Sequence, residues 1–260
     1  IMPKVLACYK WVLDEQDIKV NSEDYTLDIG RAKGKISDYD KNAVEEAVQI
    51  VEKLGGSVEA LTFGTATVKQ SFKDLLSRGP EKIYFISDAL AEKADAFVTA
   101  NVLAAGIKKL GAYDLIICGE GSADSYNQQI APRLGALLDI PAVTFVEKLT
   151  VEGNKVRAVR KLGDSTEVVT IEGPAVISVL PEINKPRIPS LKQVLAAGKK
   201  PSEELKLADL GLAADEIIPR VVTLSVKGYV SNRKNVIYKE ASAADNVAQL
   251  MASLAKEGLC

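Results

Sequence analysis

The chain has 260 residues, of which 47% are hydrophobic, so it is long enough to bury one large α/β core with or without an appendage. A formal net charge of −2 gives no reason to expect nucleic acid or an anionic membrane as a partner. The sequence contains no histidine, which removes the commonest general base and the commonest metal ligand. We therefore expect a binding protein that holds no metal and does no acid–base or nucleophilic catalysis with its own side chains.

The three cysteines, Cys8, Cys118 and Cys260, are scattered singly. Their spacing does not suit zinc, an iron–sulfur cluster or a redox dithiol. The first residues form a strand-like segment without the basic region and apolar stretch of a signal peptide, and no apolar run approaches the length of a membrane span. These features predict a cytoplasmic chain, or one in an equivalent reducing compartment, without membrane insertion.

Apolar runs of strand length alternate with segments of helical period in the first half of the chain, which is typical of a parallel sheet covered on both faces. The segment 114–118 is apolar almost throughout, so we expect it in the middle of the sheet. The predicted fold class is a doubly wound, mostly parallel α/β sheet. In chain order we predict a strand at 4–9, a helix from Ser37 to 54, a strand at 58–63, a helix at 68–77, a strand at 82–86, a helix at 94–110, a strand at 114–118 and a helix at about 128–138.

From Pro141 the pattern changes to short β-rich runs that predict an extension of the sheet, partly antiparallel. The segment 181–189 contains too many prolines for regular structure and predicts an exposed loop before a short helix from Ser190. The remainder is more polar and too poor in apolar residues for a core of its own. The β-rich runs are 142–145, 155–160, 167–171 and 175–180, and the last predicted helix is 244–256. The predicted organisation is an α/β domain at 1–183, an exposed loop and short helix at 184–201, and a C-terminal arm at 202–260.

In an open parallel sheet, ligands bind at the carboxyl ends of the strands, where helix N-termini offer free amides. The candidate loops are therefore 8–11, 63–67, 86–89 and 119–129. The last is the most informative, because its two glycines let backbone approach a ligand while Ser, Asp, Asn and Gln side chains stand beside a helix start. It predicts a nucleotide phosphate or ribose site. The alternative is that Asp124 or Ser125 only caps the following helix.

Other loops carry weaker signals. Neither a Walker loop nor a Gly-x-Gly-x-x-Gly fingerprint occurs at any strand-to-helix turn, which argues against ordinary ATPase and NAD folds. The acidic residues Asp14, Glu15 and Asp17 favour a solvated loop over a metal site, since no second carboxylate cluster accompanies them.

Together these segments resemble the β subunit of electron-transfer flavoproteins along nearly the whole chain. Residues 8–14 resemble that family's Cys-Val-Lys-x-Val-Pro-Asp opening, and residues 37–47 resemble its Asn-Pro-Phe/Tyr-Asp segment and glutamate-bearing helix. Residues 119–129 resemble its Gly-x-Gln-Ala-Ile-Asp-x-Asp-x-x-Gln pattern, and residues 184–187 resemble its Asn-Glu-Pro-Arg signature. The residues at these motifs are most similar to those of the branch linked with bacterial carnitine and anaerobic acyl-CoA metabolism.

The resemblance implies an adenine nucleotide α-hydrolase-like fold and a heterodimer with a larger α subunit that carries a redox-active FAD. The complex would carry electrons from an acyl-CoA dehydrogenase or similar flavoenzyme to a quinone-linked or other oxidoreductase, so this chain would be a carrier subunit and not an enzyme. It would hold AMP, and its arm would pack on the large subunit. The implied cofactor-binding residues are Ala7, Cys8, Lys10, Ser37, Phe63, Gly64, Thr65, Gly119, Ser122, Ala123, Asp124, Asn127, Gln128, Gln129 and Ile130.

The resemblance also makes 184–201 a partner-recognition segment. Its implied partner-binding residues are Asn184, Pro186, Arg187 and Leu191. Leu191 matches the family's anchoring leucine, which enters an apolar pocket of the partner dehydrogenase. The alternative is that Leu191 faces inward from a short helix.

The chain departs from the family at three places. Ile130 and Ala131 stand where AMP-type members have Thr-Gly, which removes a hydroxyl from the site, and Asn127 or Gln128 would have to compensate. Residues 92–95 read Glu-Lys-Ala-Asp where electron-bifurcating members have Gly-Gly-Ala-Asp, and Lys161 replaces an acidic residue that would attract the flavin domain.

Three rival interpretations remain. One is a bifurcating version that holds a second FAD and oxidises NADH. Another is an ATP-using enzyme of the same superfamily, although residues 8–11 lack the glycines of its pyrophosphate loop. The last is a purely structural protein.

Overall fold

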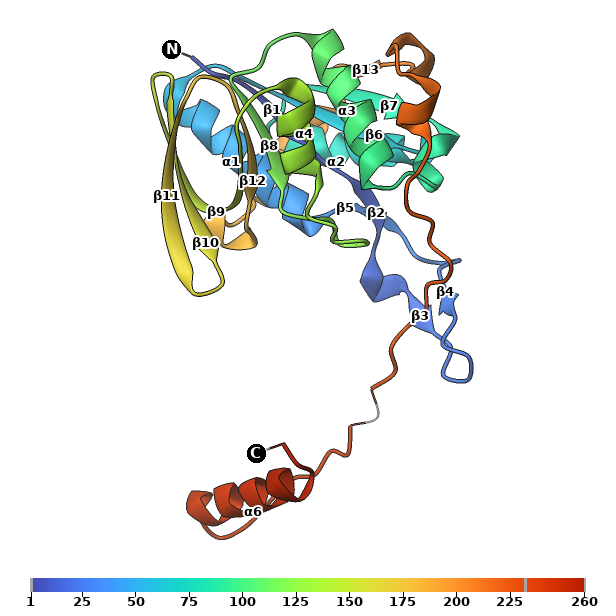
Figure 1. Ribbon diagram of the computed structural model, residues 1–260, viewed down its shortest axis with the longest axis vertical. Helices are drawn as coiled ribbons and strands as arrows, with labels where there is room; N and C mark the ends of the chain where they lie inside the picture. Colours follow the sequence, from blue (N-terminus) through green and yellow to red (C-terminus); the bar gives the residue numbers. More distant parts are fainter. Residues whose placement is uncertain (1, 232, 260) are drawn as a thin grey trace. The chain divides into compact units, whose positions relative to one another are not determined.

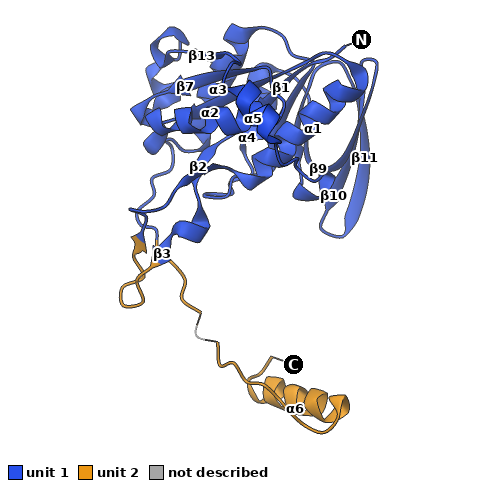
Figure 2. Cartoon of the chain, turned by 180° about the vertical axis from the view of Figure 1, so that it is seen from behind, with its two compact units in different colours: residues 1–19, 28–226 blue, residues 20–27, 227–260 orange. Residues whose placement is uncertain are grey.

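The computed structural model describes residues 2–231 and 233–259, so Cys260 lies outside the described residues. These residues form two compact units, shown in different colours in Figure 2. The first unit contains the chain up to Lys19 together with Asp28–Val226, and the second contains Val20–Leu27 together with the segment from Lys227 onward.

The first unit is built around a nine-stranded sheet, whose strands lie in the order β11-β10-β9-β12-β8-β1-β6-β7-β13 (Figure 1). The strands from β9 to β13 in this order pair in parallel, whereas β9, β10 and β11 pair antiparallel and extend one edge. β8 lies between β12 and β1 in the middle of the sheet, as its apolar sequence predicted. The strands are β1 (Lys4–Cys8), β6 (Ser57–Gly64), β7 (Lys82–Ser87), β8 (Leu115–Gly119), β9 (Ala142–Glu152), β10 (Lys155–Leu162), β11 (Ser165–Glu172), β12 (Ala175–Val179) and β13 (Ser202–Glu204).

Helices cover both faces of this sheet. One core cluster joins the sheet to α1 (Asp38–Leu54), α2 (Phe72–Ser77) and the end of α5 (Leu191–Ala197). The other joins the opposite face to α3 (Ala96–Leu110) and α4 (Ile130–Leu138). Because the central strands are buried on both sides, all five residues of β12 are buried, and they read as continuous apolar runs in the sequence. The predicted doubly wound α/β class is confirmed.

Shorter elements join these layers. They include a 3-10 turn η2 that leads into α2, and η6, whose backbone carbonyl at Glu216 accepts a hydrogen bond from Asn101 on α3. The short strands are β2 (Trp11–Leu13), β3 (Lys19–Val20), β4 (Leu27–Asp28) and β5 (Gly34–Ile36), and the 3-10 turns are η1 (Glu15–Asp17), η2 (Ala66–Ser71), η3 (Ala89–Glu92), η4 (Pro181–Ile183), η5 (Leu207–Asp209) and η6 (Ala214–Ile217).

Several predicted bounds differ from the structure by one or two residues, and three differences have a clear structural description. The helix expected at 68–77 begins as the 3-10 turn η2 and becomes α-helical only at Phe72. The helix expected from Gln128 begins at Ile130, because Gln128 has a left-handed backbone with φ of 58°. The strand expected to end at Phe145 continues to Glu152, because the φ of 60° at Phe145 marks a local irregularity in the pairing with β12 and not the end of the strand.

The C-terminal arm was expected to begin at residue 202. Instead, Ser202–Glu204 form β13, which pairs in parallel with β7 at the edge of the sheet, and the chain stays with the first unit as far as Val226. β13 is polar and exposed, so no apolar pattern in the sequence announces it.

The second unit is small and contains the helix α6 (Ala243–Lys256). Gly228 donates its backbone N–H to the carbonyl of Tyr25, and a Cβ at Gly228 would lie 2.4 Å from Val20. The segment from Lys227 therefore begins in close contact with the hairpin 20–27, which explains why two distant stretches of sequence belong to one unit.

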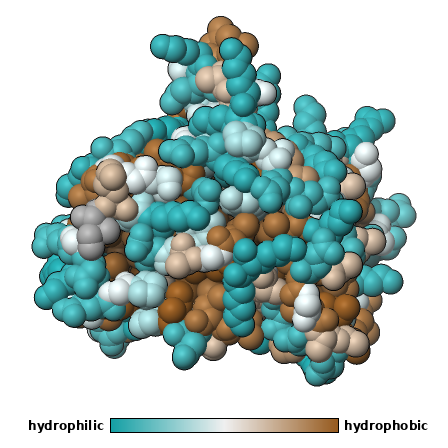
Figure 3. Space-filling view, turned by 90° about the horizontal axis from the view of Figure 1, so that it is seen from above, coloured by the Kyte–Doolittle hydropathy of each residue, from teal (hydrophilic) through white to brown (hydrophobic). Residues whose placement is uncertain are grey.

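Hydrophobic side chains also reach the surface. On the face shown in Figure 3 they gather in patches between hydrophilic ones. The largest exposed fractions of hydrophobic side chains fall in the proline-rich segment and beyond residue 217, where Ile188 is 92% and Leu224 is 95% exposed. Such exposure is a common mark of a surface that a partner covers.

Candidate functional site

A cavity of about 1310 Å³ opens at the carboxyl ends of β1, β6 and β8, within the first unit. This is the position that the parallel topology predicted for a ligand site. Its walls come from three strand-end loops, from the start of α3 and from the segment 218–223. Most of the predicted cofactor-binding residues line it: Cys8, Lys10, Phe63, Gly64, Thr65, Gly119, Ser122, Asp124, Asn127, Gln128, Gln129 and Ile130.

Three predicted residues lie outside the cavity lining. Ala7 and Ser37 are completely buried, and Ala123 is a partly exposed residue of the loop 119–129. Ser37 still contributes to the site, because its hydroxyl accepts a hydrogen bond from the backbone N–H of Ala123 at 3.3 Å. That contact ties the start of α1 to the loop.

The loop 119–129 has an irregular backbone held by its own side chains. Tyr126 and Gln128 have φ values of 44° and 58°, a conformation that non-glycine residues seldom adopt without support. The Tyr126 hydroxyl donates to Glu120 at 2.6 Å, and the Tyr126 ring lies 5.1 Å from the ring of Tyr39. Polar residues of this loop, among them Ser122, Asn127 and Gln128, line the cavity.

Asp124 does not cap the following helix, so the capping alternative was wrong. The N-cap of α4 is Gln129, whose side chain makes no capping bond. Asp124 instead accepts a bond from the backbone N–H of Ser125 at 2.8 Å and binds the Lys10 ammonium at 2.6 Å. Burial opposes ionisation of Asp124, but Lys10 and the donated hydrogen bonds hold its pKa below the usual value. The pair joins the loop after β1 to the loop after β8.

Asp40 is a site residue that the sequence reasoning missed. It lies in the first turn of α1, is 6% exposed and lines the cavity. Its carboxylate accepts hydrogen bonds from the backbone N–H of Lys10 at 2.8 Å and of Gly119 at 3.3 Å. The segment 37–40 was singled out in the sequence, but nothing there indicated that this carboxylate would be buried between two loops.

Gly119 is required by this close approach. A Cβ at this position would lie 2.7 Å from Oδ1 of Asp40 and 2.8 Å from the backbone carbon of Tyr39. Any side chain would therefore push the start of α1 away from the end of β8.

Two buried thiols form part of the cavity wall. Cys8 and Cys118 lie at the ends of the neighbouring strands β1 and β8, and both are free. A hydrogen bond with Cys8 and burial together raise the pKa of the Cys118 thiol well above its ordinary value. Cys118 is therefore kept protonated and is a poor nucleophile.

The far wall of the cavity is fixed by Asp95. One carboxylate oxygen of Asp95 caps α3 through the N–H of Val98, and the other accepts the backbone N–H groups of Arg220 and Val221 at 2.6 and 2.9 Å. The Arg220 guanidinium lies 4.8 Å from the centre of the Phe97 ring. The segment 218–223 thus forms part of the cavity wall.

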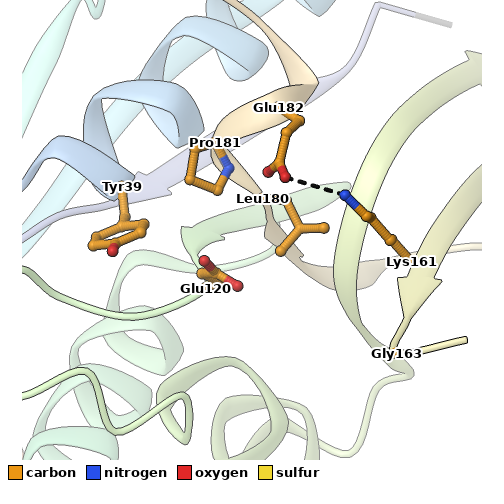
Figure 4. A pocket seen from close by; sticks show the side chains of 7 residues that line it. All are labelled: Tyr39, Glu120, Lys161, Gly163, Leu180, Pro181 and Glu182. Atoms are coloured by element: carbon orange, nitrogen blue, oxygen red, sulfur yellow. Dashed lines mark hydrogen bonds and ion pairs between the residues drawn. The ribbon is translucent and has the colours of Figure 1, made fainter. Parts of the chain in front are cut away.

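A smaller cavity of about 440 Å³ lies beside Tyr39 and Glu120 (Figure 4). Its rim includes Lys161, which points toward Glu182 and pairs with it at 3.3 Å. The positive charge at Lys161 is thus partly neutralised within the chain. Its other lining residues are Gly163, Leu180 and Pro181.

The predicted recognition segment is held against α1. Arg187 makes paired hydrogen bonds to Glu45 and to Glu52, with distances from 2.6 to 3.0 Å. The Asn184 amide donates to Glu46 and to the carbonyl of Asn42. These bonds fix the backbone of the proline-rich loop before α5.

Beyond that loop, apolar side chains point outward. Leu191 is 75% exposed and Leu195 is 65% exposed, and Ile188 is exposed beside them in sequence. The alternative in which Leu191 faces inward does not hold. Ser190 begins α5 with a capping box, so the position of Leu191 is well defined.

The acidic residues after the first strand have partners within the chain. The Lys35 ammonium pairs with Asp14 and Glu15, which accounts for the acidic cluster after the first strand. Across residues 2–231 and 233–259, no group of side chains could hold a metal ion. No helix in that part of the chain is long and apolar enough to cross a membrane.

The family model for the electron transfer flavoprotein domain matches residues 26–210, which includes every strand of the main sheet except β1 and contains the loop 119–129. The match covers well over half of the chain, and members of this family are electron carriers. This chain therefore belongs to the electron transfer flavoprotein domain family.

Proposed function

We propose that this chain is the small, β-type subunit of an electron-transfer flavoprotein, which holds AMP and works with a larger FAD-carrying subunit. The observation that carries the proposal is the cavity at the carboxyl ends of β1, β6 and β8, lined by the loop 119–129 in a chain of this family. The chain supplies position and charge, and the flavin supplies the redox chemistry.

The cavity suits an adenine nucleotide in its chemistry. Hydroxyl and amide side chains from Ser122, Asn127 and Gln128 lie on one wall, and Phe63 adds an apolar surface. Thr65 contributes a hydroxyl from a second loop. Asn127 and Gln128 are therefore placed to replace the hydroxyl that Ile130 and Ala131 lack.

The size of the cavity leaves room for more than a mononucleotide. Its volume exceeds the roughly 300–1,000 Å³ of common small-molecule sites, and this is the one observation that favours a second FAD and a bifurcating complex. Glu92 and Lys93 oppose that alternative, because their side chains line the cavity where bifurcating members have glycines. AMP is the occupant that we propose.

A feature of the second unit, the apolar face of α6, supports the proposal of a large partner subunit. Val247, Leu250 and Met251 lie at spacings of three and four residues on α6 and are 57%, 45% and 49% exposed. An apolar helix face of this kind needs a covering surface to be stable in water. We propose that the FAD-carrying subunit provides it.

The loop 184–190 and α5 support a second partner, an acyl-CoA dehydrogenase or a related flavoenzyme. Leu191 projects from a backbone that Arg187 and Asn184 already hold, so little conformational entropy is lost when it enters a pocket. We propose that electrons pass from this partner to the flavin of the large subunit and then to a quinone-linked or other oxidoreductase.

Assembly of this chain with its flavin-carrying subunit tests the proposal by absorbance spectroscopy. A reduced acyl-CoA dehydrogenase should reduce the bound flavin, and omission of this chain should abolish the reaction. Direct oxidation of NADH by a complex with two flavins would favour the bifurcating alternative. A fully assembled complex that accepts no electrons from any acyl-CoA dehydrogenase would contradict the proposed partner.

A further inference from the structure

Asp40 joins the two loops that enclose the inner end of the cavity. Its Oδ2 accepts the Lys10 amide from the loop after β1, and its Oδ1 accepts the Gly119 amide at the end of β8. β1 and β8 are neighbouring strands, and β1 ends at Cys8. One carboxylate on a third element, α1, thus sets how far the two loops stand from each other.

Both amides depend on this carboxylate. The Lys10 amide lies beyond the last residue of β1, and the backbone bond from the loop to β12 is made by Glu120, whose N–H reaches the carbonyl of Val179 at 3.1 Å. A buried backbone N–H without a partner costs free energy comparable to a lost hydrogen bond, so each loop is stabilised in the position where Asp40 meets it.

Charged and titratable groups approach Asp40 from the loop after β1, from the loop after β8 and from α1 itself. Lys10 stands on the loop after β1 and pairs with Asp124 on the loop after β8. The thiols belong to Cys8, the last residue of β1, and to Cys118, the residue before the last in β8, and on α1 itself Asp38 is engaged by Lys35 and Lys41. Burial raises the pKa of Asp40 to about 7, although the two backbone hydrogen bonds and Lys10 oppose that rise, and Asp124 adds to it.

We propose that Asp40 is a positioning residue of the nucleotide site, whose ionised carboxylate holds the two loops in the arrangement that binds the nucleotide. The inference rests on the proposed function, because it assumes a nucleotide in this cavity. An ionised carboxylate accepts hydrogen bonds at both oxygens, whereas a protonated one turns one oxygen into a donor. Protonation therefore releases one loop, and nucleotide affinity falls as the pH is lowered through neutrality.

Titration calorimetry on the assembled complex tests this without a mutation. Adenosine is the sharper probe, because it lacks the phosphate of AMP, which itself titrates near neutral pH, and this chain contains no histidine. We expect the dissociation constant for adenosine to rise about tenfold between pH 8 and pH 6, since a group with a pKa near 7 is mostly protonated at pH 6. A flat adenosine profile would overturn the inference.

Asp40→Asn is the matching variant, because its amide keeps the shape but has only one acceptor oxygen. At pH 8 we expect it to bind AMP about tenfold more weakly than the native complex, with a pH profile that shows only the contribution of the AMP phosphate. Asp38→Asn, on the same turn of α1 but bound only to lysines, should keep the native affinity and profile.

The outcomes separate this inference from the proposed function. Native affinity and a native pH profile in Asp40→Asn would overturn the role of Asp40 while the nucleotide site stands. A native complex that binds neither AMP nor adenosine at any pH would overturn both. Thermal unfolding of Asp40→Asn shows whether a lost affinity reflects lost folding, and in that case the adenosine profile of the native complex decides.

Discussion

Gly119 is a residue of the candidate site that tolerates little change. Gly119→Ala would place a Cβ 2.7 Å from Oδ1 of Asp40, against the backbone of Tyr39, so the end of β8 and the start of α1 must separate. We expect a loss of about 1–3 kcal/mol in the free energy of unfolding and a loss of bound nucleotide.

Thermal unfolding and the nucleotide content of the purified complex measure these two effects. Gly163→Ala is the matched control, since a Cβ there meets nothing within 4 Å. Equal unfolding temperatures and equal nucleotide content in the two variants would show that the contact at Gly119 has no consequence.

Arg187 is the second residue whose replacement should have a large effect, because its side chain pairs with the buried carboxylate of Glu45. Glu45 is 5% exposed; burial raises its pKa, but the hydrogen bonds and charge of Arg187 bring the pKa below the usual value. Arg187→Gln would leave Glu45 without its charged partner, and we expect a loss of roughly 3 kcal/mol in the free energy of unfolding at pH 7.

The pH dependence of that loss has a definite sign. Because the pKa of Glu45 is lowered by folding, the stabilisation is present above the unfolded pKa and disappears as the pH falls through the lower, folded value. Chemical denaturation at pH 7 and below pH 4 should therefore show the native chain and Arg187→Gln converging in acid. Arg157→Gln, on the exposed side of β10, should change neither value by more than about 0.5 kcal/mol.

At the scale of elements, α1 connects the two surfaces for which a function is proposed, the cavity and the loop before α5. Its first turn supplies Asp40 to the cavity, and its later turns supply Glu45 and Glu52 to the loop that precedes α5. The helix is buried along one face by the central sheet. A shift of α1 would therefore move the nucleotide loops and the recognition segment together.

The exposed leucine of α5 gives a prediction about partner binding. Leu191→Ala should weaken electron transfer with the dehydrogenase at least tenfold, because the exposed anchor is lost, and should leave flavin content and folding unchanged. Stopped-flow reduction of the complex by the dehydrogenase measures the transfer rate. Val168→Ala removes a similar exposed side chain from β11 and should keep the native rate. Unchanged transfer in Leu191→Ala would remove Leu191 from the interface.

The apolar face of α6 gives a parallel prediction for the large subunit. Leu250→Glu should prevent or strongly weaken assembly, because a charge would be buried against the partner, yet leave the α/β unit folded. Ala252→Glu places the same charge about 160° from Leu250 around the helix, outside the apolar face, and should still assemble. Size-exclusion chromatography of each variant with the large subunit distinguishes them, and equal assembly would exclude α6 from the interface.

At the scale of the whole molecule, the sequence predicts those strands whose residues are buried on both faces of the sheet. β8 is buried on both faces, so its apolar run could be identified and placed in the middle of the sheet. The run of β12 was also identified, but it was expected in the β-rich extension, whereas it pairs in parallel with β8. The parallel order of the strands then indicated which loops would line a cavity, because the carboxyl ends of the strands meet at one edge. The long helices followed from their period and from glycines such as Gly55 and Gly111 at their ends.

The sequence could not predict features that depend on distant partners. Asp40 occupies a helix position where carboxylates are usually solvated, and only the approach of two loops buries it. β13 is three polar residues that become a strand because β7 offers a free edge. Phe145 interrupts a strand locally, and no nearby residue indicates that the strand continues beyond it.

The nucleotide content of the assembled complex tests the central claim most directly. The native heterodimer is purified, denatured and analysed by chromatography for released flavin and adenine nucleotides. The proposal predicts one FAD and one AMP per heterodimer, with less AMP retained by Asp40→Asn and Gly119→Ala while FAD is kept. Fully assembled complex that releases no AMP would contradict it, and two FAD without AMP would assign the cavity to a second flavin.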